Sequence, residues 1–185
     1  MRKNNSIFKM VLAAMFLAIA YVLPFFTGQI PEIGSMLCPM HIPVLLCGFL
    51  CGWPWGLAVG FFAPLLRSVV LGMPPLFPTA VCMAFELATY GVMTGLFYKW
   101  FPKKKGFLYV VSIYASLIIA MVAGRLVWGG AMLVCTGMKD GSFGAAAFLA
   151  GAVTNAIPGI VLQLVLVPVV VMLLERVRRA GGARE

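Results

Sequence analysis

Long apolar runs joined by short turns occupy almost the whole chain and restrict it to a membrane fold. Of its 185 residues, 63% are hydrophobic and only 10% are charged. A soluble domain of this size cannot bury so much apolar surface, so lipid must be part of the solvent. We therefore predict a single integral membrane domain over residues 1–185, an all-α bundle of six transmembrane helices. The predicted helices span about 7–26, 41–53, 56–71, 79–100, 107–135 and 143–175.

The turns between these runs are rich in proline and glycine. The segment 52–56 reads as a tight turn, and the proline-rich segment 72–78 reads as a loop, because proline interrupts helices.

Basic residues gather in three clusters, and their positions predict the topology. The net charge is +9, and the clusters precede the first predicted helix, follow the fourth and follow the sixth. An even number of helices places all three clusters on one side, which the positive-inside rule assigns to the cytoplasm. This bias explains the net charge without nucleic acid. The clusters are Arg2, Lys3 and Lys9; Lys99 and Lys103 to Lys105; and Arg176, Arg178, Arg179 and Arg184.

The composition gives little support for a metal site or a catalytic site. The chain has one histidine and five cysteines, and no pair of cysteines has the spacing of a metal finger. No Ser–His or paired-acid constellation suggests hydrolysis. We expect neither a metal site, nor a cofactor, nor an enzymatic activity.

Four ionisable residues interrupt the apolar helices: His41, Arg67, Glu86 and Arg125. Such residues are costly inside a bilayer and usually mark a functional site. With a rise of about 1.5 Å per residue, all four and Asn155 fall in the outer half of the membrane. This common depth predicts a polar solute-binding pocket.

Two aromatic residues extend the predicted pocket. Tyr90 lies four residues after Glu86 and Trp128 three residues after Arg125, so each shares a helix face with its charge. Two arginines against one carboxylate also favour an anionic ligand.

Each pocket residue also has a purely structural interpretation, which the sequence leaves open. Arg67 could extend to the outer headgroups. Glu86 and Arg125 could form an ion pair that only joins two helices. His41 could cap a helix, and Asn155 could bond between helices.

The first predicted helix carries a small-residue pair that suits a partner helix. Ala14 and Ala18 are four residues apart, which allows another helix to approach closely. Packing inside the bundle is the alternative.

The chain resembles a known family over its full length. The basic start runs into Ala14-Met15-Phe16-Leu17-Ala18; the stretch His41 to Gly52 (HIPVLLCGFLCG) and the stretch Trp55 to Gly60 (WGLAVG) follow. Together with the six helices, these segments are similar to the substrate-binding S components of energy-coupling-factor (ECF) vitamin transporters. The resemblance carries no ligand residue over, because ligand contacts in such proteins vary with the substrate.

The resemblance implies a substrate-binding subunit of an ATP-driven importer in a bacterial-type cell membrane. Such a subunit captures a vitamin from outside and docks on a transmembrane coupling protein, through residues that Ala14 and Ala18 match. Two cytosolic ATPases then power release. Charge favours an anionic vitamin such as pantothenate, while riboflavin, folate, niacin and a pyridoxine-like compound stay open.

An autonomous proton-coupled secondary transporter of a small organic solute is the alternative function. Glu86 would then be the proton site, because buried carboxylates can relay protons.

Overall fold

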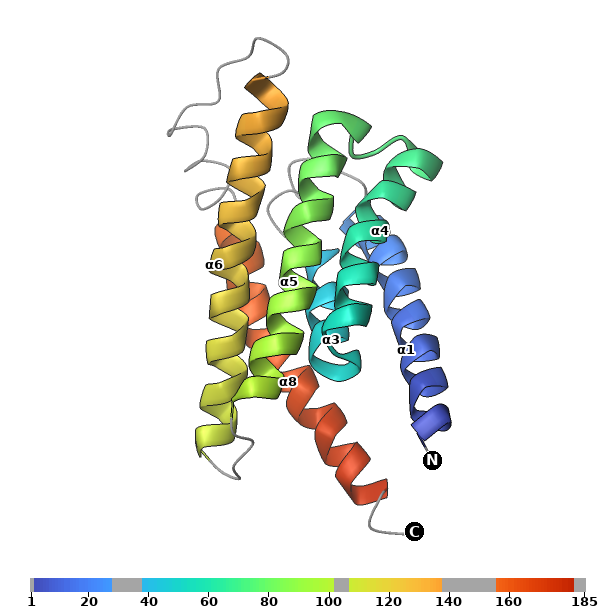
Figure 1. Cartoon of the computed structure of the whole chain (residues 1–185), viewed down its shortest axis with the longest axis vertical. Coiled ribbons are helices and arrows are strands. Elements are labelled where there is room, and N and C mark those ends of the chain that lie inside the picture. Colours follow the sequence, from blue (N-terminus) through green and yellow to red (C-terminus); the bar gives the residue numbers. More distant parts are fainter. Residues whose placement is uncertain (1, 28–37, 102–106, 138–155, 182–185) are drawn as a thin grey trace.

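The described part of the chain is a bundle of six α-helices and contains no strand (Figure 1). The computed structural model describes residues 2–27, 38–101, 107–137 and 156–181, and the side chains among them from Ser6 to Val177. The predicted all-α class and helix count are confirmed there. The first helix begins and the last helix finishes at the same end of the bundle, which we call the termini end. The α-helices are α1 (Arg2–Val22), α3 (His41–Cys51), α4 (Trp53–Leu71), α5 (Val81–Trp100), α6 (Phe107–Gly137) and α8 (Ile157–Gly181).

Five of these helices are long and apolar enough to cross a membrane, and α3 is not. With 11 residues, α3 extends for only about 16 Å, roughly half the hydrocarbon thickness. It nevertheless forms the centre of the molecule, because ten of its residues are buried and α1, α4, α5 and α8 all pack against it. A half-length helix therefore begins inside the bundle, and its first residue is His41.

The turn between α3 and α4 is shorter than predicted. Instead of a turn over 52–56, the chain leaves α3 at Cys51 and begins α4 at Trp53. Gly52 makes the reversal alone with φ +96°, a conformation that glycine adopts at no steric cost. Pro54 fits the first turn of α4, where its missing N–H would have no partner within the helix.

The other predicted boundaries differ more modestly. α4 ends at Leu71 and is capped by Gly72, whose φ is +71°. The predicted loop after it contains a short π-helical segment, η2 (Leu76–Ala80), before α5. α1 is followed by a 3-10 turn, η1 (Leu23–Thr27). The last helix continues past the predicted end at residue 175 to Gly181, while residues 143–155 of the predicted helix lie outside the described part.

Glycines set the contact between α4 and α5. A Cβ on Gly91 would collide with the backbone of Gly56, and a Cβ on Gly60 would collide with the backbone of Leu87. Only glycine permits so close an approach of two helix backbones. The contacts also define an antiparallel register of α4 and α5.

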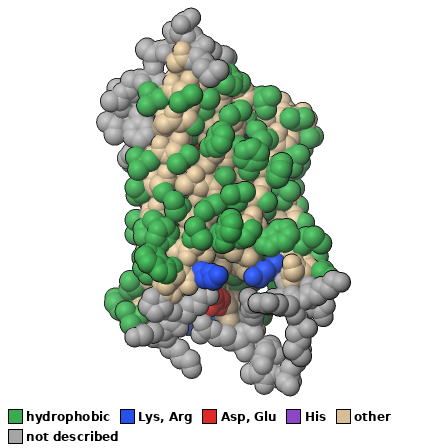
Figure 2. All heavy atoms as spheres, in the orientation of Figure 1, with side chains coloured by type: hydrophobic (Ala, Val, Ile, Leu, Met, Phe, Trp, Pro, Cys, Tyr) green, Lys and Arg blue, Asp and Glu red, His purple; other side chains and the backbone are tan. Residues whose placement is uncertain are grey.

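The lateral surface of the bundle is apolar. Figure 2 shows hydrophobic side chains over most of one face, with the visible Lys, Arg, Asp and Glu side chains gathered at the termini end. Phe62, Val69 and Leu126 are each more than half exposed. This pattern is that of a protein surrounded by lipid, and the chain is a membrane protein.

Candidate functional site

One carboxylate oxygen at the centre of the bundle gathers three neighbouring side chains. Oε1 of Glu86 on α5 lies 3.0 Å from Nη1 of Arg125 on α6 and 3.6 Å from Nε2 of His41 on α3. It also accepts a 3.0 Å hydrogen bond from the hydroxyl of Tyr90. Glu86 is 1% exposed. We call His41, Glu86, Tyr90 and Arg125 the Glu86 cluster; it joins three helices at one point.

Local structure explains how each member reaches the cluster. Tyr90 follows Glu86 by one helical turn, so both face α6 from the same side of α5. The missing side chain of Gly124 makes room for the Tyr90 ring, because a Cβ there would collide with three ring atoms. The His41 ring packs on Tyr90 with centroids 5.3 Å apart. His41 reaches this depth because α3 is short.

The cluster keeps buried nitrogens without hydrogen bonds. Both ring nitrogens of His41 and Nε of Arg125 are buried and have no hydrogen-bond partner within the described part of the chain. Such groups are costly in an apolar interior. They are therefore suited to binding polar atoms of a solute.

Arg67 was predicted to belong to the pocket, but the structure places it elsewhere. Its Nη1 donates a 3.0 Å hydrogen bond to the backbone carbonyl of Tyr21, and its guanidinium lies 5.2 Å from the centroid of the Phe25 ring. Arg67 is 5% exposed. It faces α1 and η1, so within the described residues it serves the contact between α4 and the N-terminal segment.

The position of Arg67 changes the charge balance of the predicted pocket. One arginine, not two, faces Glu86. The neighbouring Cys38 accepts a 3.7 Å hydrogen bond from Nη2 of Arg125, and burial raises the pKa of its thiol, which keeps it neutral. The cluster therefore pairs one cation with one anion beside His41, and the positive excess expected from the sequence is absent from these residues.

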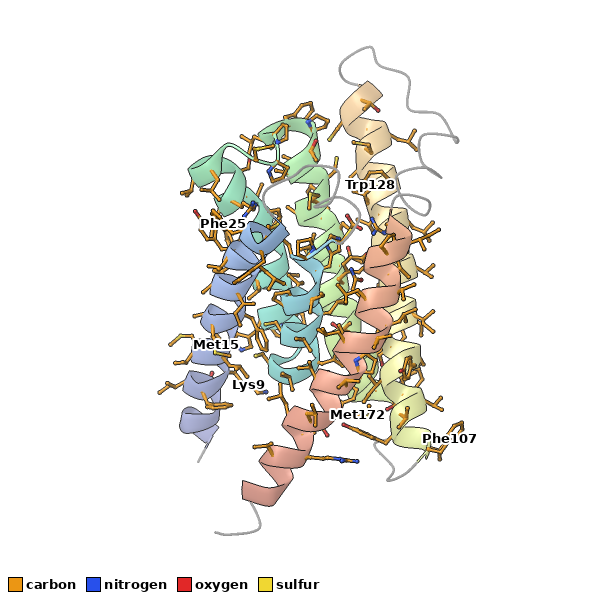
Figure 3. All side chains as sticks on the ribbon, turned by 180° about the vertical axis from the view of Figure 1, so that it is seen from behind. Lys9, Met15, Phe25, Phe107, Trp128 and Met172 are labelled. Atoms are coloured by element: carbon orange, nitrogen blue, oxygen red, sulfur yellow. The ribbon has the colours of Figure 1, made fainter. Side chains whose placement is uncertain are left out.

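Two further predicted residues are less informative. Trp128 is half-buried on α6, one turn beyond Arg125 (Figure 3). Asn155 lies outside the described residues.

Sequence reasoning missed Cys38 and Gln163. Cys38 contacts Arg125 from the segment before α3. Gln163 is 1% exposed within α8, and its side-chain nitrogen has no hydrogen-bond partner among the described residues. A lone amide in an otherwise apolar helix was a signal available in the sequence. Cys38 gave no such signal in the sequence, because cysteine also packs as an ordinary apolar residue.

Ala14 and Ala18 lie together on the outer face of α1. Both are exposed, whereas Ala13, Phe16 and Ala20 point into the bundle. Neither alanine is used for packing inside the described bundle, so the face that carries them is available to a partner.

A buried polar cluster inside a lipid-facing helical bundle is typical of membrane proteins that bind solutes. Comparison with family models places the chain more narrowly: residues 8–171 match the family described as "ECF transporter, substrate-specific component". The match covers most of the chain, which therefore belongs to this family, whose members bind substrates for transport. No curated protein and no solved structure matches.

Proposed function

We propose that this chain captures a vitamin or related micronutrient at the Glu86 cluster for ATP-driven import. The observation that carries the proposal is the set of buried nitrogens without hydrogen bonds on His41 and Arg125. In a family of substrate-specific components, a convergent polar group at the centre of an apolar bundle is the first place to seek the substrate.

The charge of the cluster bears on the class of ligand. Because Arg125 is already paired with Glu86, the cluster offers a balanced set of donors and acceptors. This favours a neutral or dipolar polar ligand, and the charge argument for an anionic vitamin such as pantothenate no longer applies. His41 and Tyr90 add aromatic surface for a flat ring system.

Delivery would require partners that this chain lacks. We propose that the outer face of α1, with Ala14 and Ala18, docks on a transmembrane coupling protein that works with two cytosolic ATPases. The termini end then faces the cytoplasm of a bacterial-type cell, in line with the basic clusters. ATP would act on the partners, and this chain would need no cofactor.

The alternative of a proton-coupled transporter gains no support from the contacts of Glu86. A carboxylate that carries protons must release its partners in each cycle, whereas Glu86 faces Arg125, His41 and Tyr90 at once.

The test compares Arg125 with Arg67, an arginine outside the Glu86 cluster. The protein is purified in mild detergent as wild type, Arg125→Ala and Arg67→Ala, and the bound small molecules are identified by mass spectrometry. We expect wild type and Arg67→Ala to retain a stoichiometric solute and Arg125→Ala to lose it. Thermal unfolding of each variant verifies that it is folded.

Retention of the solute by Arg125→Ala at the wild-type level would refute the Glu86 cluster as the solute site. If the wild type is purified empty, a thermal-shift panel of pantothenate, riboflavin, folate, niacin and pyridoxine replaces retention as the readout. The absence of any shift across that panel would count against a vitamin as substrate.

A further inference from the structure

A second cavity lies at the termini end, apart from the Glu86 cluster. It has a volume of about 550 Å³, within the range of small-ligand sites, and no member of the cluster lines it. Its walls come from α1, the α3–α4 turn, the end of α5 and α8. The lining residues are Ser6, Lys9, Gly48 to Trp55, Gly95, Tyr98, Lys99 and Glu175.

Two lysines and one glutamate line this cavity, so its lining carries a formal net charge of +1 (2 − 1). Lys9 is half-buried on α1 and Lys99 is exposed on α5. Neither has a hydrogen bond or an ion pair with any described residue. Figure 3 shows Lys9 extending from α1 toward the neighbouring helices rather than away from them.

The one carboxylate in the wall does not pair with these lysines. Glu175 accepts hydrogen bonds from the hydroxyls of Tyr98 and Tyr109, one on each oxygen. No ion pair joins it to Lys9 or Lys99 among the described side chains. The first turn of α4 adds positive partial charge to the wall, and the last turns of α3 and α5 add negative partial charge, so the helix ends do not decide the sign. The two lysines without ion pairs are what make the cavity suited to an anion.

The surroundings indicate that this anion is attached to a lipid. Trp53, 44% exposed, lines the cavity, and tryptophan is enriched at the depth of lipid headgroups. Beside Lys9, the side chains of Phe8, Met10 and Val11 are each at least half exposed on α1. A headgroup phosphate in the cavity would leave its acyl chains free to lie along this apolar surface, which a soluble anion would not need.

The geometry points to a binding site for the phosphate of an anionic phospholipid in the cavity between Lys9 and Lys99. The site is independent of the solute site and does not rest on the proposed transport function. Its occupant would bridge α1 and α5 at the end of the bundle where these helices emerge from the membrane.

The test measures retained lipid by native mass spectrometry of the full-length protein in detergent. Phosphatidylglycerol and phosphatidylcholine are titrated separately against wild type, Lys9→Gln, Lys99→Gln and the double variant. We expect each substitution to weaken phosphatidylglycerol binding about fivefold, with phosphatidylcholine unaffected. Lys9→Arg should keep wild-type binding, because it keeps the charge.

Arg176→Gln is the matched control. Arg176 is exposed near the same end of the bundle but does not line the cavity, so its loss removes the same charge from another place. Wild-type lipid binding by Lys9→Gln and Lys99→Gln, or an equal loss in Arg176→Gln, would overturn the site. Unchanged thermal unfolding of the lysine variants verifies that they are folded.

A competition experiment separates a lipid from a soluble phosphate compound. Inorganic phosphate and glycerol 3-phosphate are added in excess to the protein–phosphatidylglycerol complex. We expect the lipid to stay bound, because the acyl chains contribute to its affinity. Displacement by either soluble compound would show that the cavity takes free phosphates and would overturn the assignment to a lipid.

Discussion

At the scale of single residues, the centre of the molecule depends on one oxygen atom. Oε1 of Glu86 faces a guanidinium, an imidazole and a phenol in a region without solvent. An isolated carboxylate there would be very costly, and pairing with Arg125 offsets that cost. Nε of Arg125 and Nδ1 of His41 have no hydrogen bond among the described residues, and Nε2 of His41 only faces Glu86 at 3.6 Å. The proposed solute binding would therefore use the same atoms that stabilise the centre of the bundle.

A double-mutant cycle between Glu86 and Arg125 should reveal their coupling. We expect Glu86→Gln and Arg125→Gln each to lower the free energy of unfolding by about 3–5 kcal/mol, because each leaves one buried charge without its partner. The double variant should be less destabilised than the sum of the two. Denaturant unfolding in detergent provides the measurement, and additivity within about 0.5 kcal/mol would contradict the pairing.

Removal of the Tyr90 hydroxyl tests the third contact of Glu86. Tyr90→Phe keeps the ring beside His41 and Gly124 but removes the 3.0 Å hydrogen bond to the carboxylate. We expect a loss of about 1.5–3 kcal/mol in the free energy of unfolding, the range for a hydrogen bond to a charged group. Tyr114→Phe is the control, because that exposed tyrosine has no hydrogen bond to a described residue. An equal effect in both variants would exclude a specific role for the Tyr90 hydroxyl.

At the scale of helices, close backbone approach determines how α5 is held. Glycines recur four residues apart at Gly56 and Gly60 on α4, and again at Gly91 and Gly95 on α5. This spacing places each set on one helix face, and the two faces meet. Because Glu86 and Tyr90 belong to α5, the glycine contact also positions the solute site.

Alanine at Gly91 should therefore be destabilising, although alanine favours helices. Its Cβ would collide with the backbone of Gly56, which cannot move without shifting α4. We expect Gly91→Ala to lower the free energy of unfolding by about 1–3 kcal/mol. Gly130→Ala is the matched control, because no described atom would lie within 4 Å of the added Cβ. We expect no loss in the free energy of unfolding and a gain of up to about 1 kcal/mol. Equal stability of the two variants would show that α4 and α5 are not this close.

At the scale of the whole molecule, the two proposed sites lie apart, one in the interior and one on the surface. The half-length α3 carries His41 into the centre, while the long helices separate that centre from lipid. The outward face of α1 adds a separate surface, on which Figure 3 shows Met15 pointing away from the bundle. Solute binding and partner docking should therefore be separable by mutation.

Large side chains on the outer face of α1 should abolish solute uptake by cells but leave solute binding by the purified protein intact. Ala14→Leu and Ala18→Leu place large side chains on an exposed face and leave the Glu86 cluster untouched. In cells that contain the coupling protein and ATPases, we expect uptake of the labelled solute to fall at least tenfold, with solute binding to the purified protein unchanged. Gly130→Leu adds similar bulk to the open side of α6 and should keep uptake. Normal uptake by the alanine variants would remove the docking role of α1.

The sequence by itself determined the membrane class, the set of helices and most of the polar residues at the centre. These properties depend on local hydropathy and on the cost of a charge in an apolar run, both of which can be read along the chain. The same reasoning predicted a common level for Glu86, His41 and Arg125, and these three side chains meet in the structure. Their depth in the membrane stays a prediction. The roles of Ala14 and Ala18 and the identity of the ligand stay predictions.

Only the tertiary structure decided which of the two arginines faces Glu86. Arg67 and Arg125 are equivalent by hydropathy, but the packing of α4 against α1 brings Arg67 to Tyr21, and the packing of α5 against α6 brings Arg125 to the carboxylate. The direction in which a helical side chain points depends on how segments distant in sequence pack together. For the same reason, the cavity between Lys9 and Lys99 exists only once α1, the α3–α4 turn and the end of α5 come together in the bundle.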